Sequence, residues 1–130
     1  MSIDTVGNFI TIIRNGITAS LPAVYAPYSN LKYQLASILK DEGFIVDFGI
    51  EGDGAKKNLK VILKYVDGES AIHEITRVSK PSRRVYKGVC SLKPVIGGLG
   101  IAVLTTPRGV VTNKQAKMLN VGGEVICTVW

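Results

Sequence analysis

The sequence has few of the residues that most often build metal centres and catalytic sites. Its 130 residues include two cysteines, one histidine and one tryptophan. Cys90 and Cys127 are far apart and form no Cys-x-x-Cys pair, so the sequence indicates neither a zinc site nor a disulfide framework. Reduced thiols in a cytoplasmic protein are the simplest interpretation. We expect no metal and no other cofactor.

Long hydrophobic runs are also missing. No apolar stretch approaches the roughly 20 residues that a bilayer-spanning helix needs. The N-terminus, Met1 to Asp4, has neither a basic segment nor the cleavage signal of a secreted protein. We therefore expect a cytoplasmic protein with no membrane partner.

The single histidine limits catalytic interpretations. His73 lies in an expected strand beside Glu74, whose side chain would point to the opposite face, so a Ser-His-Asp arrangement is not favoured. Most acidic residues cluster in expected turns of the first half, where we interpret them as solvated loop residues. No Walker motif is present. The sequence therefore predicts that the protein is not an enzyme.

Charge is unevenly distributed along the chain. Residues 1–74 carry seven basic and nine acidic side chains, whereas residues 75–130 carry nine basic side chains and one acidic. The overall net charge of +6 thus arises in the second half. A concentrated positive charge favours a polyanion such as nucleic acid as the partner, although a merely soluble basic surface would have the same composition.

Two helices are predicted in the first half, because apolar residues recur there at helical spacing. We expect Gly16 to end the first helix, Ser29 to cap the start of the second, and Gly43 to end the second. The apolar positions are Val6, Phe9, Ile10, Ile13 and Ile17 in the first helix, and Leu31, Leu35, Ile38 and Leu39 in the second.

The hydrophobic period then changes to two, which predicts strands. Three strands are expected at residues 44–49, 59–66 and 71–77, the last two joined by a tight turn at Asp67-Gly68. We expect these strands to form a three-stranded meander that the helices cover.

The second half is predicted to be mostly β with one short helix, which Thr112 caps. Proline and small polar residues around Ser79 break both periods, so we place a boundary there. The expected fold class is α+β with two small domains. Residues 1–78 would form an N-terminal domain with helices packed on a three-stranded sheet. Residues 79–130 would form a β-rich RNA-binding domain that ends in a strand at residues 124–130.

The segment from Ser79 to Lys93 is the first candidate for nucleic-acid contact. Tyr86 adds a ring able to stack on a base or a ribose. A solvated basic loop would look similar. The basic residues interleaved with Tyr86 are Lys80, Arg83, Arg84, Lys87 and Lys93.

The loop that begins at Thr105 is the second candidate. Thr105 and Thr106 place two hydroxyls at the end of an apolar strand, where each could contact a 2′-OH, a base edge or a phosphate. Arg108 supplies charge, and Gly109 allows a tight backbone. We expect the Thr106 hydroxyl to lie against RNA, and because side chains alternate along a strand, we expect only one of the two hydroxyls to do so. The alternative is an ordinary β-turn.

Short motifs that extend essentially from end to end of the chain match a known family. They are Arg14-Asn15-Gly16, Pro27-Tyr28-Ser29, Leu31-Lys32, Leu39 to Ile45, Arg77 to Pro81, Arg84 to Lys87, Gly98 to Val103, Gly122 to Val125, and Val129-Trp130. With these motifs in the family's order, most of the chain resembles the ribosomal protein S-eight family of the bacterial small subunit.

The resemblance implies a structural constituent of the small ribosomal subunit that binds the central domain of small-subunit rRNA and helps to assemble the platform. Small-subunit proteins five and twelve are implied as neighbours, and repression of the protein's own operon through its mRNA as a possible second role. Together with the patterns above, it predicts RNA-binding residues at Lys80, Arg83, Arg84, Tyr86, Lys87, Thr105, Thr106, Arg108, Gly109, Gly123 and Glu124.

One position departs from the family pattern. The family loop usually reads Ser-Thr-Ser before a basic residue and Gly, whereas Pro107 here removes the third hydroxyl and a backbone N–H. Glu124 is the only acid in the basic half, and we expect it to accept from a base amino group, to orient an arginine, or to balance charge. Two other classes stay open at this point: an enzyme acting on RNA, and a protein-interaction module without RNA contact.

Overall fold

The computed structural model describes residues 5–52, 54–80, 82–88 and 100–130. The described chain forms two compact units, residues 5–72 and residues 73–130. Each unit has helices and antiparallel strands of its own, which confirms the predicted α+β fold class. No helix within the described residues is both long enough and apolar enough to span a bilayer.

Two amphipathic helices belong to the first unit, α1 (Thr5–Thr18) and α2 (Asn30–Asp41). Ser29 caps α2 as predicted, because its Oγ accepts a hydrogen bond from the backbone N–H of Lys32 at 3.2 Å. The chain leaves α2 through Gly43, whose φ of +82° favours glycine.

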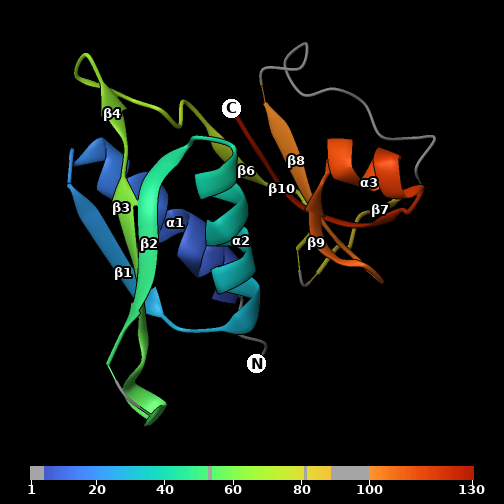
Figure 1. Cartoon of the computed structure of the whole chain (residues 1–130), viewed down its shortest axis with the longest axis horizontal. Helices are drawn as coiled ribbons and strands as arrows, with labels where there is room; N and C mark the ends of the chain where they lie inside the picture. Colours follow the sequence, from blue (N-terminus) through green and yellow to red (C-terminus); the bar gives the residue numbers. More distant parts are fainter. Residues whose placement is uncertain (1–4, 53, 81, 89–99) are drawn as a thin grey trace. The chain divides into compact units, whose positions relative to one another are not determined.

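The sheet of the first unit consists of β1 (Ala23–Pro27), β2 (Ile45–Glu51) and β3 (Asn58–Leu63), in the order β1-β3-β2. A short 3-10 helix, η1 (Gly54–Lys56), lies between β2 and β3. Apolar side chains of α1 and α2 and of one sheet face form the core, which confirms the predicted packing of helices on a three-stranded sheet (Figure 1). The buried residues include Phe9, Ile13, Leu35, Leu39, Leu59 and Val61.

The predicted meander is wrong in its third strand. Strand β1 pairs with β3 and completes the sheet, whereas residues 75–77 form β6 (Ile75–Arg77) in the sheet of the second unit. The tight turn at Asp67-Gly68 is confirmed, since it joins β4 (Tyr65–Val66) to β5 (Glu69–Ser70) as a separate hairpin. Alternation alone shows which residues form strands, but the strand partners are set by tertiary packing.

Gly16 does not end α1, contrary to prediction. The helix continues for two residues beyond it, and a Cβ at position 16 would collide with the side chain of Val24 in β1. Glycine is needed here because the helix and the strand approach each other closely, not because the helix stops.

The second unit is built on a five-stranded sheet in which β6-β10-β8-β9 form a path and β7 pairs with β10. Its remaining elements are β7 (Tyr86–Lys87), β8 (Ile101–Thr106), β9 (Gly109–Thr112), α3 (Asn113–Leu119) and β10 (Gly123–Val129). Thr112 caps α3 as predicted, in a reciprocal capping box with Gln115. Helix α3 packs on the sheet, where Ala116 joins a buried cluster with Ala102 and Leu104 of β8, Val111 of β9 and Val125 of β10.

Candidate nucleic-acid interface

Four strands of the second unit bring side chains from distant parts of the sequence into one cross-strand row. Tyr86 in β7 lies opposite Glu124 in β10, which lies opposite Thr105 in β8, which lies opposite Val110 in β9. Residues directly opposite one another share a sheet face. The two candidate segments identified from sequence, the basic one and the threonine one, are therefore joined through the start of β10.

Two glycines allow the strands to meet at this point. A Cβ on Gly123 would collide with the carbonyl of Thr105, and a Cβ on Gly122 would lie 2.5 Å from the carbonyl oxygen of Lys87. Real side chains do not approach that closely, so β7, β10 and β8 come together because position 122 and position 123 lack side chains. Gly123 thus has a clear packing role, and its contact with RNA stays a prediction.

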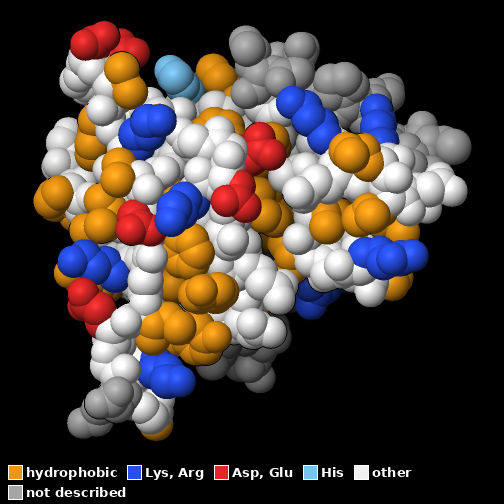
Figure 2. Space-filling model, in the orientation of Figure 1, with side chains coloured by type: hydrophobic (Ala, Val, Ile, Leu, Met, Phe, Trp, Pro, Cys, Tyr) orange, Lys and Arg blue, Asp and Glu red, His pale blue; other side chains and the backbone are white. Residues whose placement is uncertain are grey.

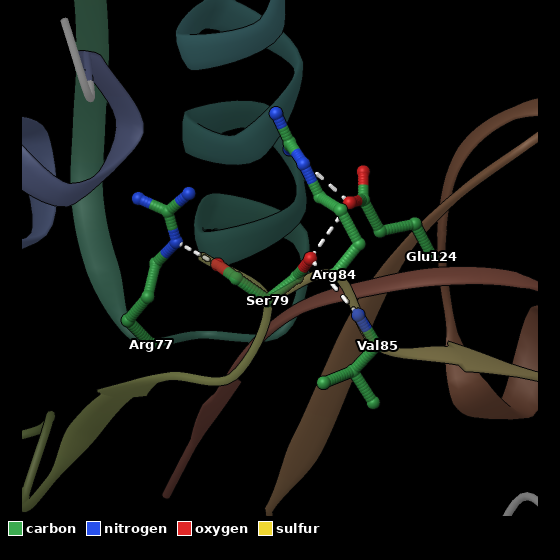
Figure 3. Close-up of polar contacts among 5 residues, drawn as sticks. All are labelled: Arg77, Ser79, Arg84, Val85 and Glu124. Atoms are coloured by element: carbon green, nitrogen blue, oxygen red, sulfur yellow. Dashed lines mark hydrogen bonds and ion pairs between the residues drawn. The ribbon is translucent and has the colours of Figure 1, made fainter. Parts of the chain in front are cut away.

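A partly buried polar network lies beside this row (Figure 3). The Ser79 hydroxyl donates to Oε2 of Glu124 at 2.6 Å and accepts from the backbone N–H of Val85 at 3.2 Å. The same Oε2 pairs with Nη1 of Arg84 at 3.2 Å, and the Ser79 carbonyl accepts from Nε of Arg77. Of the roles considered for Glu124, the orientation of an arginine is the one that this geometry displays.

The loop that follows Ser79 displays basic side chains on a fixed backbone. Lys80 and Arg83 form an antiparallel bridge, with N–H to carbonyl distances of 2.9 and 3.0 Å. Both side chains are exposed, as are those of Arg84 and Lys87. The ring of Tyr86 is 70% exposed, which is unusual for an aromatic side chain and leaves its faces open for stacking.

The β8–β9 turn separates the roles of the two threonines. The Thr106 hydroxyl donates to the carbonyl of Gly109 at 2.8 Å and accepts from the N–H of Arg108 at 3.1 Å, so it stabilises the turn. The Thr105 hydroxyl has no hydrogen-bond partner within the described ranges. Pro107 suits the first corner of such a turn, and Gly109 adopts a φ of +103°. Of the pair, Thr105 has the unengaged hydroxyl.

Two exposed lysines of α3 were not identified from the sequence. Lys114 and Lys117 lie three residues apart on the helix surface, and Met118 beside them is 86% exposed. Figure 2 shows Lys and Arg side chains over the part of the surface that α3 and the β8–β9 hairpin form. The sequence signal that could have identified Lys114 and Lys117 is their helical spacing, which places them on a helix face away from Ala116. Lys93, another predicted contact, lies outside the described residues.

Cys127, His73 and Glu74 are engaged in structural contacts. Burial raises the pKa of the Cys127 thiol to about 12, against a smaller opposing effect of Arg77, so this thiol is neutral and unreactive at pH 7. The His73 ring stacks on Trp130 with centroids 5.5 Å apart, and Glu74 accepts from the Trp130 indole N–H at 3.0 Å. Over the described ranges no three His, Cys, Asp or Glu side chains are grouped to hold a metal ion.

The fold and this site define an α+β protein that displays exposed basic side chains beside one row of its second sheet. The family model for ribosomal protein S8 matches residues 4–130. A protein named small ribosomal subunit protein uS8 from Solibacter usitatus is 46% identical over 131 residues and covers all of both chains. Its namesake from Marinobacter nauticus is 49% identical over 127 residues, 98% of this chain and 97% of its own.

The chain therefore belongs to the ribosomal protein S8 family. This confirms the family that the sequence motifs indicated. It also confirms the predicted class, a structural ribosomal protein of the cytoplasmic ribosome and not an enzyme.

Proposed function

We propose that this protein is a structural constituent of the small ribosomal subunit and binds the central domain of small-subunit rRNA through residues 79–130. The observation that carries the proposal is the row Tyr86–Glu124–Thr105, with exposed arginines and lysines on the loops beside it. Residues 73–130 carry nine basic and two acidic side chains, so phosphates are attracted to this unit.

The expected target is an irregular RNA helix. The major groove of regular A-form RNA is too deep and narrow for side chains, so a protein must read the minor groove, 2′-hydroxyls and unstacked bases. The Tyr86 ring suits stacking, the unengaged Thr105 hydroxyl suits a 2′-OH or base edge, and Arg83 and Arg108 suit phosphates. Early binding of this kind would help to assemble the platform of the subunit.

The first unit is suited to different partners. Residues 5–72 carry seven basic and seven acidic side chains, and Figure 2 shows both signs interspersed over the face in view. This balance supports contacts with protein neighbours, and the family resemblance indicates small-subunit proteins five and twelve. An mRNA of the protein's own operon would compete for the basic unit if it reproduces the rRNA site.

The test is ultraviolet crosslinking and footprinting with the full chain on a transcript of the central domain of small-subunit rRNA. Crosslinks should concentrate in residues 80–130 and protections in one irregular helix. Replacing Arg108 by Ala should weaken the correct and a scrambled RNA alike and lower the salt slope by about one counterion. Lys60→Ala, in the first unit, is the matched control and should change neither. Crosslinks concentrated in residues 40–70 would contradict the proposal.

A further inference from the structure

Ser79 is buried at the start of an exposed basic loop, and all of its polar groups are engaged. Its side chain is 1% exposed. Its N–H donates to the carbonyl of Val125 at 3.1 Å, and its carbonyl accepts from Arg77. The hydroxyl serves as donor to Glu124 and as acceptor for the N–H of Val85. One serine therefore ties β10 to both ends of the loop that displays Lys80 and Arg83.

The network ends at a side chain that faces solvent. The Arg84 side chain is 51% exposed, whereas that of its partner Glu124 is only 15% exposed. A guanidinium has five N–H donors, and within the described ranges only one nitrogen of Arg84, Nη1, has a hydrogen-bond partner. The remaining donors suit a phosphate, which guanidinium groups bind in two-pronged geometry. Figure 3 shows Arg84 and Ser79 converging on the same carboxylate.

We propose that Ser79 is a positioning residue for RNA binding: it fixes the carboxylate of Glu124, which in turn holds Arg84 ready for a phosphate. This inference rests on the proposed function and deepens it. A flexible arginine loses rotamer freedom when it binds, and ordering it beforehand lowers that cost. The gain offsets the repulsion that the Glu124 carboxylate by itself would exert on a phosphate.

The test is a double-mutant cycle in the full chain with the variants Ser79→Ala, Arg84→Ala and both together. Binding of the labelled central-domain transcript is measured at several salt concentrations, at a temperature where every variant is fully folded. Ser79→Ala should weaken binding about fivefold and lower the salt slope toward that of Arg84→Ala. The double variant should bind as Arg84→Ala does. In free protein, exchange of the Val85 amide hydrogen should accelerate in Ser79→Ala.

Thr112→Ala is the matched control for a purely structural effect. Thr112 is also 1% exposed and its hydroxyl caps α3, so its loss lowers stability without touching the network. This variant should leave both affinity and salt slope unchanged. Two results would overturn the positioning role and leave the proposed function standing, provided that the parent protein binds. One is that the binding losses of Ser79→Ala and Arg84→Ala add in the double variant. The other is that Ser79→Ala keeps the parental salt slope. Failure of the parent to bind the transcript overturns both the positioning role and the proposed function.

Discussion

The clearest prediction concerns Thr105 and Thr106, neighbours with the same side chain and different hydrogen bonds. Replacement by Val keeps the volume of each and removes only the hydroxyl. At position 106 this removes two contacts that hold the β8–β9 turn, at 2.8 and 3.1 Å. A typical intramolecular hydrogen bond contributes about 1 kcal/mol net, and exposure to water reduces that. Thr106→Val should therefore lower the free energy of unfolding by about 1 kcal/mol.

Thr105→Val should have the opposite profile. The Thr105 hydroxyl has no partner over the described ranges, so the free energy of unfolding should change by less than about 0.5 kcal/mol. If the hydroxyl meets RNA, its removal leaves a polar partner unmatched and costs about 1–3 kcal/mol. That loss corresponds to about 5- to 150-fold in affinity for the correct RNA and should be absent for a scrambled hairpin.

The assay pairs urea unfolding with titrations of the labelled central-domain transcript. Thr128→Val is the control, since it removes a half-buried hydroxyl from β10 four residues beyond the row. It should affect neither measurement strongly. The reasoning would be refuted if fully folded Thr106→Val lost discrimination between the two RNAs while Thr105→Val bound like the parent.

Two further predictions follow from close packing and burial. Gly123→Ala should destabilise the protein by about 1–3 kcal/mol in urea unfolding, because the new methyl group would collide with the carbonyl of Thr105. Gly88→Ala is the control, since a Cβ at position 88 would meet open space. An equal loss of stability in Gly88→Ala would contradict the packing argument. In a Cys90→Ser background, Cys127 should resist alkylation by iodoacetamide at pH 7 until denaturant is added, because burial raises the pKa of its thiol to about 12. Alkylation of the native protein would show that this burial is incomplete.

The sequence by itself determined the three helices, the longer strands and where the charge lies, but not the short strands β7 and β9. Helical spacing and caps at Ser29 and Thr112 are local properties, since the capping side chain and the N–H it binds are three residues apart. The excess of basic residues in the second half follows from counting charged residues in the sequence. Motif order was enough to indicate the family, because the similar segments extend along the whole chain.

Only the tertiary structure decided which segments meet. Alternation could not show that β1, and not residues 75–77, completes the first sheet, because strand pairing is a long-range choice driven by burial of whole faces. The prediction that Gly16 ends α1 failed for the same reason, because the Val24 side chain that excludes a Cβ at position 16 belongs to β1.

The site shows the same limit. Ser79 and Glu124 are 45 residues apart in the chain and 2.6 Å apart in space, and no spacing rule connects them. The sequence predicted Thr106 as the RNA-contacting hydroxyl, whereas the structure engages that hydroxyl in the β8–β9 turn. The hydroxyls of Thr105 and Thr106 differ because one faces the carbonyl and N–H of a turn while the other lies on the opposite side of the strand, and that geometry exists only once β8 and β9 have paired.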